Sequence, residues 1–93
     1  MIYVDNVTDY PQGMIARPVK RHGCRWCHLF GTDLEELHLF AKGIGLRKEW
    51  FQDKPGFPHY DITPVKRNMA LLRGAVAKSL INYLRERRVS AYD

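Results

Sequence analysis

The chain has 93 residues, a formal net charge of +5 and an apolar fraction of 45%. This length allows one small domain, and no apolar run approaches the roughly 18 residues that a membrane-spanning helix needs. Residues 1–5 contain neither a basic region nor a long apolar run, so we expect no signal peptide and a cytoplasmic, reducing location.

The excess positive charge lies in the last part of the chain. Residues 1–63 contain eight basic and eight acidic side chains, whereas residues 64–93 contain seven basic and two acidic ones. A basic segment of this kind attracts nucleic acid or another phosphate-rich partner, and it is equally typical of a solvated helix face. Both interpretations stay open at this point.

Two early segments have the composition of β-strands. Residues 1–5 and residues 24–30 are rich in β-branched and aromatic side chains, so we predict a strand in each. Residues 6–22 form a long polar connection between them, which contains Pro11, Gly13 and Pro18.

A first helix is predicted over residues 33–42. Thr32 can cap its first turn, and Glu35 can reach back to complete a capping box. His38 lies on the same side as the apolar residues of this helix, so we expect it to face the protein interior. Gly43 is a suitable residue to end the helix.

The second half of the chain predicts one short element and one long one. Residues 59–62 resemble an extended segment or edge strand, and Thr63 followed by Pro64 is a strong helix start. One apolar face then continues through Val65, Met69, Leu72, Val76, Leu80 and Tyr83. Gly74 interrupts this face and is expected to kink or split the helix.

These elements predict a small α/β domain. We expect a short sheet of two or three strands packed by two or three helices, with a basic C-terminal helix. The whole chain, residues 1–93, would be a single domain, with a core over about residues 1–76 and a basic helical extension over about residues 77–93.

The two cysteines allow three interpretations. The segment Cys24–His28 matches the spacing of a haem attachment motif, and its two thiols with His28 could instead contribute three ligands to zinc, with His22, His38 or His59 as a fourth. A strand would turn Cys24 and Cys27 to opposite sides, which disfavours both groups. Buried or uninvolved thiols are therefore the favoured interpretation.

Histidines and carboxylates recur where the predicted elements end. Imidazoles and carboxylates that converge at such ends suit a divalent catalytic metal or an acid/base site. The candidate catalytic and metal-ligating residues are Asp5, His28, His38, His59 and Asp61.

The start of the second long helix is a candidate anion site. Exposed backbone N–H groups there, together with Thr63 and Arg67, could hold a phosphate group, and Lys66 could add charge. Trp26 or Tyr60 could stack on a base or another ring.

The combined pattern resembles the domain of unknown function 4031 family, small proteins of bacteria and their phages with no assigned activity. The resemblance covers residues 1–76 and implies a shared fold and site, but no reaction. Its motifs are Tyr3-Val4-Asp5, Trp26-Cys27-His28-Leu29, Glu36 to Ala41, Gly45, Trp50-Phe51-Gln52, His59 to Thr63, Arg67 and Gly74-Ala75. The family pattern does not require cysteine at positions 24 and 27, so the resemblance implies no site formed by Cys24 and Cys27.

The leading functional hypothesis is binding of a phosphate-bearing small ligand, such as a nucleotide. Arg67 and Thr63 would bind the phosphate, and the other side chains would bind the rest of the ligand. The expected ligand-binding residues are Trp26, His28, His38, Gln52, His59, Tyr60, Asp61, Thr63 and Arg67.

Two alternatives stay open, and so does the question of whether the protein is an enzyme. The first is a metal-dependent hydrolase, a nuclease or phosphoesterase, that uses a divalent metal in the His/Asp site. The second is an interaction module that binds nucleic acid or a host protein through its basic C-terminal helix. A homodimer formed through that helix is a further expectation, and no membrane partner is expected.

Overall fold

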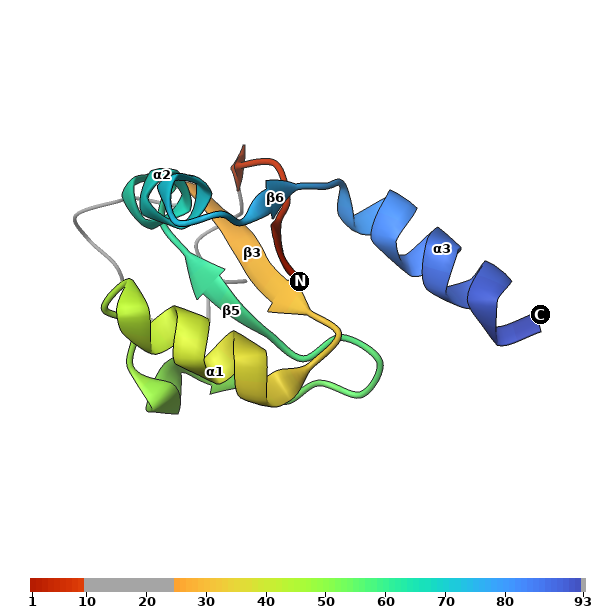
Figure 1. Ribbon diagram of the computed structural model, residues 1–93. Helices are drawn as coiled ribbons and strands as arrows, with labels where there is room; N and C mark the ends of the chain where they lie inside the picture. Colours follow the sequence, from red (N-terminus) through yellow and green to blue (C-terminus); the bar gives the residue numbers. More distant parts are fainter. Residues whose placement is uncertain (10–24, 93) are drawn as a thin grey trace.

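A computed structural model describes residues 1–9 and 25–92 of the chain (Figure 1). Of the predicted connection over residues 6–22, residues 10–22 lie outside the described residues, and so does Cys24. The elements in chain order are β1 (Ile2–Val4), β2 (Thr8–Asp9), β3 (Arg25–Gly31), α1 (Leu34–Gly43), the 3-10 turn η2 (Lys48–Trp50), β4 (Phe51–Gln52), β5 (His59–Ile62), α2 (Pro64–Leu72), β6 (Val76–Ala77) and α3 (Leu80–Tyr92).

A mixed sheet lies at the centre of the molecule. Five strands follow the order β4-β5-β3-β1-β6, and the short strand β2 also pairs with β3. Among the strands of the described residues, only the pairing of β1 with β6 is parallel. The sequence-based prediction of two or three strands was too low, because β2, β4 and β6 have two residues each and show no recognisable alternation. β5 is also an inner strand and not an edge strand.

One face of the sheet packs against α1 and α2. Val4, Leu29 and Ile62 turn toward this side and form the hydrophobic core with Leu37 of α1 and Ala70 of α2. All five side chains are essentially inaccessible to solvent, so this layer supplies most of the apolar burial that stabilises the domain. Figure 1 shows α1 and α2 beside the sheet and α3 extending away from β6.

The opposite face of the sheet has a smaller apolar cover. Successive strand residues point to alternate sides, so Tyr3 and Phe30, which pair across β1 and β3, share this second face. The ring of Tyr83, from the start of α3, packs against both, with centroids 5.5 Å from Tyr3 and 4.6 Å from Phe30. The same face also holds the buried Trp26 of β3 and the site described below.

An irregularity separates β1 from β2. Val4 pairs with Leu29 and Thr8 pairs with Trp26, so three residues of the first strand lie opposite only two residues of β3. Such a bulge breaks the regular ladder and redirects a side chain. Asp5 itself still lies opposite His28, since its backbone N–H donates to the His28 carbonyl oxygen at 3.3 Å, so its side chain shares the face of His28 by ordinary strand alternation. The extra residue lies within residues 6–7.

The cap of α1 differs from the predicted one. Asp33, and not Thr32, is the N-cap, and its Oδ1 accepts a hydrogen bond of 3.1 Å from the backbone N–H of Glu36. Asp33 and Thr32 are both good capping residues, and the choice depends on where the chain leaves β3. The predicted cap of α2 is confirmed, since Thr63 accepts a hydrogen bond from the backbone N–H of Lys66.

The apolar series that predicted one long helix face is divided in the structure. α2 ends at Leu72, and Gly74 adopts a φ of 103°, which glycine reaches without strain. The chain then forms β6 before α3 begins. Val65, Leu72 and Val76 are exposed, whereas Tyr83 is buried, because the break turns the two halves of the series in different directions.

A C-terminal helix is present as α3. Side-chain surroundings beyond residue 86 lie outside the description, so its basic surface stays a prediction. Within residues 1–9 and 25–92, no helix combines the length and the apolar character that crossing a membrane requires.

The position of the α1 cap can be tested by substitution. We expect Asp33→Ala to lower the free energy of unfolding by about 1 kcal/mol, because the N–H of Glu36 loses its acceptor. The matched change Thr32→Ala should cost less than about 0.5 kcal/mol. Urea denaturation of the two variants measures both values, and a larger loss for Thr32→Ala would contradict the assignment.

Candidate metal centre

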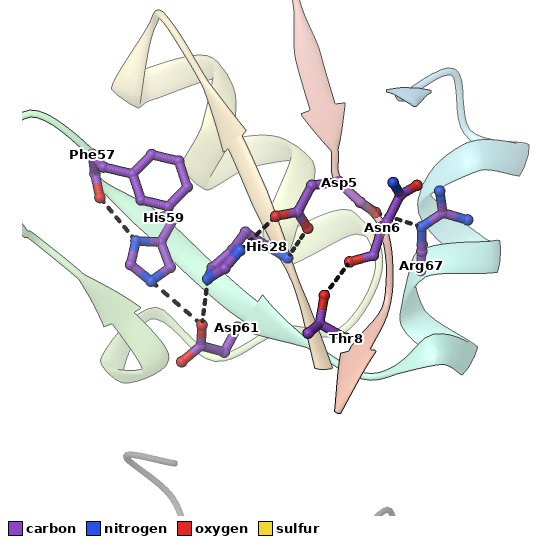
Figure 2. Close-up of polar contacts among 8 residues, drawn as sticks. All are labelled: Asp5, Asn6, Thr8, His28, Phe57, His59, Asp61 and Arg67. Carbon is purple, nitrogen blue, oxygen red and sulfur yellow. Dashed lines mark hydrogen bonds and ion pairs between the residues drawn. The ribbon is translucent and has the colours of Figure 1, made fainter. Parts of the chain in front are cut away.

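A group of polar side chains lies on the sheet face opposite α1 and α2. His28 on β3 pairs directly with Asp61 on β5. His59 precedes Asp61 by two residues and therefore projects from the same face. Gln52 on β4 pairs with His59, so its side chain lies on the same face as the two histidines and Asp61. Figure 2 shows the two imidazoles pointing toward the Asp61 carboxylate.

The two histidines approach one oxygen of Asp61 through their Nε2 atoms. The distance from Asp61 Oδ1 is 3.3 Å to His59 Nε2 and 3.7 Å to His28 Nε2. These three donor atoms all lie within 4.8 Å of one another. Their side chains are largely buried, with 4% of His59, 17% of His28 and 24% of Asp61 exposed.

The other ring nitrogen of each histidine is already engaged. His28 Nδ1 donates to Asp5 Oδ2 at 2.6 Å, and His59 Nδ1 donates to the backbone carbonyl oxygen of Phe57 at 2.8 Å. A carboxylate and a carbonyl can only accept, so Nδ1 carries the proton in both rings. A protonated ring donates its Nε2–H to Asp61, whereas a neutral ring presents there a lone pair that a metal ion can bind.

Asp61 is also held in position by a neighbour. The side-chain amide of Gln52 donates a hydrogen bond to Asp61 Oδ2, which leaves Oδ1 for the histidines. Burial raises the pKa of the Asp61 carboxyl. When the two rings are protonated, the hydrogen bond and charge of His59, the charge of His28 and the Gln52 amide together outweigh burial, so the net pKa lies below the usual value. Asp61 is therefore ionised and available as a ligand at neutral pH.

Asp5 is the partner that orients His28. Its Oδ1 accepts the backbone N–H of His28 at 2.6 Å while Oδ2 accepts the ring N–H. Its backbone carbonyl accepts a 2.8 Å hydrogen bond from Arg67 Nε on α2. Asp5 was predicted as a possible metal ligand, but both of its carboxylate oxygens face His28, so it fixes a ligand and does not itself complete the group.

Phe57 is a site residue that sequence reasoning missed. Its ring stacks on His59 with centroids 4.6 Å apart and meets the ring of His28 edge-on at 5.3 Å. An apolar neighbour of this kind lowers the local dielectric around a metal site. The spacing of residues 57, 59 and 61 by two could have indicated that Phe57 shares a face with His59 and Asp61. The proline and glycine residues around Phe57 suggested only a loop.

The donor set suits a divalent transition metal. Two imidazole nitrogens and one carboxylate oxygen are ligands that zinc, manganese and iron accept, and a three-ligand site leaves room for water. Bonds of about 2.0–2.1 Å place tetrahedral ligand atoms about 3.4 Å apart. The separations of 3.3 and 3.7 Å from Asp61 Oδ1 are close to that value, while the group as a whole spans up to 4.8 Å, so the two imidazoles would have to approach each other to complete the coordination.

His38 and Tyr60 lie on the other side of the sheet. Tyr60 stands between His59 and Asp61 in β5 and therefore points toward α1. Its hydroxyl group lies 2.7 Å from His38 Nδ1. The sequence suggested that His38 would share a site with His28, but the structure separates them by the thickness of the sheet.

Other predicted ligand-binding residues are engaged elsewhere. Trp26 is 3% exposed and Tyr60 is 1% exposed, so neither ring offers an open face for stacking. Thr63 caps α2, and Arg67 donates to Asp5. Lys66 Nζ donates to the backbone carbonyl of Ile44 at 2.6 Å. These contacts use part of the hydrogen-bonding capacity of Thr63, Lys66 and Arg67, and the phosphate site at the start of α2 stays a prediction.

Cys27 does not belong to the metal group. It is fully buried on the side of the sheet that packs against the helices, and it is a free thiol. Burial, with a smaller contribution from the negative charge of Asp5, raises its pKa to about 12. The thiolate that zinc binding needs is thus strongly disfavoured, and Cys24 lies outside the described residues.

Comparison with known proteins gives a family and no activity. A family model described as "Protein of unknown function (DUF4031)" matches residues 2–90, essentially the whole chain, and so extends beyond the residue 76 limit of the predicted resemblance. No curated protein and no solved structure matches the chain.

The burial of Cys27 predicts low thiol reactivity. In a Cys24→Ser variant at pH 8, we expect a thiol-specific reagent to modify the native protein only as fast as it unfolds, because the raised pKa keeps the buried thiol protonated. Modification should be immediate in denaturant. Rapid modification of the native variant, followed by absorbance or mass, would contradict the assignment.

Proposed function

Because the chain belongs to the DUF4031 family of proteins of unknown function, we propose its function from the site itself: a metal-dependent hydrolase that acts on phosphate esters. The proposed ligands of one divalent metal ion are His28, His59 and Asp61. The metal itself and the reaction are both part of the proposal.

One observation supports the metal most strongly. Each of the three donor side chains is fixed by a contact on its other polar atom: His28 by Asp5, His59 by the carbonyl oxygen of Phe57, and Asp61 by Gln52. Carboxylate or carbonyl partners on the remote nitrogen are the usual companions of metal-ligating histidines. The remaining donor atoms, Nε2 of the two rings and Oδ1 of Asp61, thereby converge on one point where a metal ion can lie.

The surroundings of the site favour hydrolysis over purely structural binding. Three protein ligands leave a coordination position open, whereas structural zinc sites usually have four. A metal in such a site lowers the pKa of a bound water to about 7 and so supplies a nucleophile at neutral pH. The role of the chain is to hold its ligands, with Asp5 and Gln52 orienting them and Phe57 excluding water from one side.

Phosphate esters are the proposed substrate class on grounds of charge. The chain has a formal charge of +5, and a positive protein attracts anionic substrates. Binding of a phosphate-bearing ligand at Thr63 and Arg67 is less well supported, because both side chains already serve the fold. An interaction of the C-terminal segment with nucleic acid or a host protein, and a homodimer, stay predictions.

Metal binding is the first test of the proposal. We expect the wild-type protein to bind one Zn²⁺ or Mn²⁺ ion per chain in a calorimetric titration. Asp5→Asn should weaken binding by about 10- to 100-fold, because the amide keeps only one acceptor oxygen for the two N–H groups of His28 that Asp5 now accepts. His28→Gln should weaken binding further, since it removes a ligand nitrogen.

His38→Gln is the matched control, because it removes an imidazole on the opposite side of the sheet. It should leave the metal affinity unchanged, and thermal unfolding should show that all variants are folded. Equal losses of affinity for His28→Gln and His38→Gln would contradict the assigned site.

Hydrolysis is tested separately. We expect the metal-loaded protein to hydrolyse 4-nitrophenyl phosphate or bis(4-nitrophenyl) phosphate, to lose this activity in EDTA, and to recover it when the metal is restored. Asp61→Asn should remove the activity. If a stoichiometrically loaded protein hydrolyses neither ester, the proposed reaction is wrong while the metal site stands.

A further inference from the structure

A cavity lies on the reverse side of the sheet from the metal centre. It has a volume of about 460 Å³ and opens between the end of α1 and the turn η2. Its side chains include His38 and Lys42 of α1, Leu46 and Arg47 of the connecting segment, Lys48 of η2, and Tyr60 of β5. This volume is within the range of cavities that hold small organic ligands.

The rim of the cavity is positively charged. Lys42, Arg47 and Lys48 contribute three cationic side chains, and Glu49 contributes the single acid, with its carboxylate 3.7 Å from Arg47 Nε. The excess of two positive charges matches a dianion. An arginine between two lysines supplies both paired N–H donors and point charges, which suits the oxygens of a phosphate group.

The interior of the cavity combines an apolar surface with one hydrogen-bond donor. Leu46 and Leu39 contribute the apolar part of the lining. The Tyr60 hydroxyl lies 2.7 Å from His38 Nδ1, and burial raises the pKa of Tyr60, so the phenol keeps its proton and can donate it to that nitrogen. A neutral His38 then carries its own proton on Nε2, where it can donate to a ligand.

We propose that this cavity binds a phosphate monoester with an apolar or aromatic substituent. The phosphate would contact Lys42, Arg47 and Lys48, and the substituent would pack on Leu39 and Leu46 with His38 donating a hydrogen bond. The site is separate from the metal centre, since His59 and Asp61 leave β5 on one face and Tyr60 on the other. It therefore does not depend on the proposed hydrolase activity.

Titration of ¹⁵N-labelled protein with phenyl phosphate tests the proposal. The protein is kept in EDTA, so that no metal contributes to binding. We expect saturable shifts of the amide signals of α1 and η2, weak or no binding of phenol, and weaker binding of inorganic phosphate than of phenyl phosphate. These comparisons separate the contribution of the substituent from that of the phosphate.

Charge-matched double variants locate the ligand. Lys42→Ala with Arg47→Ala should weaken phenyl phosphate binding by about tenfold or more, because charge-assisted hydrogen bonds are lost. Lys54→Ala with Arg85→Ala removes the same net charge outside the cavity and should change the affinity little. Absence of saturable binding, an equal loss in both double variants, or shifts confined to β3 and β5 would each overturn the proposal.

Discussion

The carboxylate of Asp5 connects the parts of the molecule on which the candidate site depends. Asp5 follows β1 and lies opposite His28 of β3, and its carboxylate accepts both the backbone N–H and the ring N–H of that residue. The backbone carbonyl of the same residue accepts from Arg67 on α2. Asp5 is 8% exposed, so these contacts satisfy polar groups that would otherwise be costly to bury. One residue thereby links strand pairing, helix packing and the orientation of a ligand.

The alternation of side chains along β5 divides the functional surfaces. His59 and Asp61 face the metal centre, and Tyr60 between them faces the cavity beside α1. A single short strand therefore supports two sites of different chemistry, one made of neutral and anionic donors and one made of cations. The rigidity of a strand with neighbours on both sides, β3 and β4, keeps the two sites apart.

Much of this arrangement could be predicted from the sequence, and the failures have physical causes. The strands around Val4, Leu29 and Ile62 and the helix start at Thr63 follow from local composition and capping, which act over a few residues. Which histidines share a face depends on strand register, which is fixed by pairing between distant segments. His38 was grouped with His28 because the sequence does not show which face of the sheet α1 covers, and the orienting role of Asp5 was not foreseen because it depends on pairing with the distant His28.

The account depends on where the ring protons of the histidines lie. Long-range ¹H–¹⁵N NMR spectra of the histidines, recorded before and after one equivalent of Zn²⁺, report this directly. We predict that Nδ1 carries the proton in both His28 and His59, and that zinc shifts Nε2 of these two rings while His38 is unchanged. A neutral His28 or His59 ring with its proton on Nε2, or Nε2 chemical shifts that do not change when zinc is added, would contradict the account.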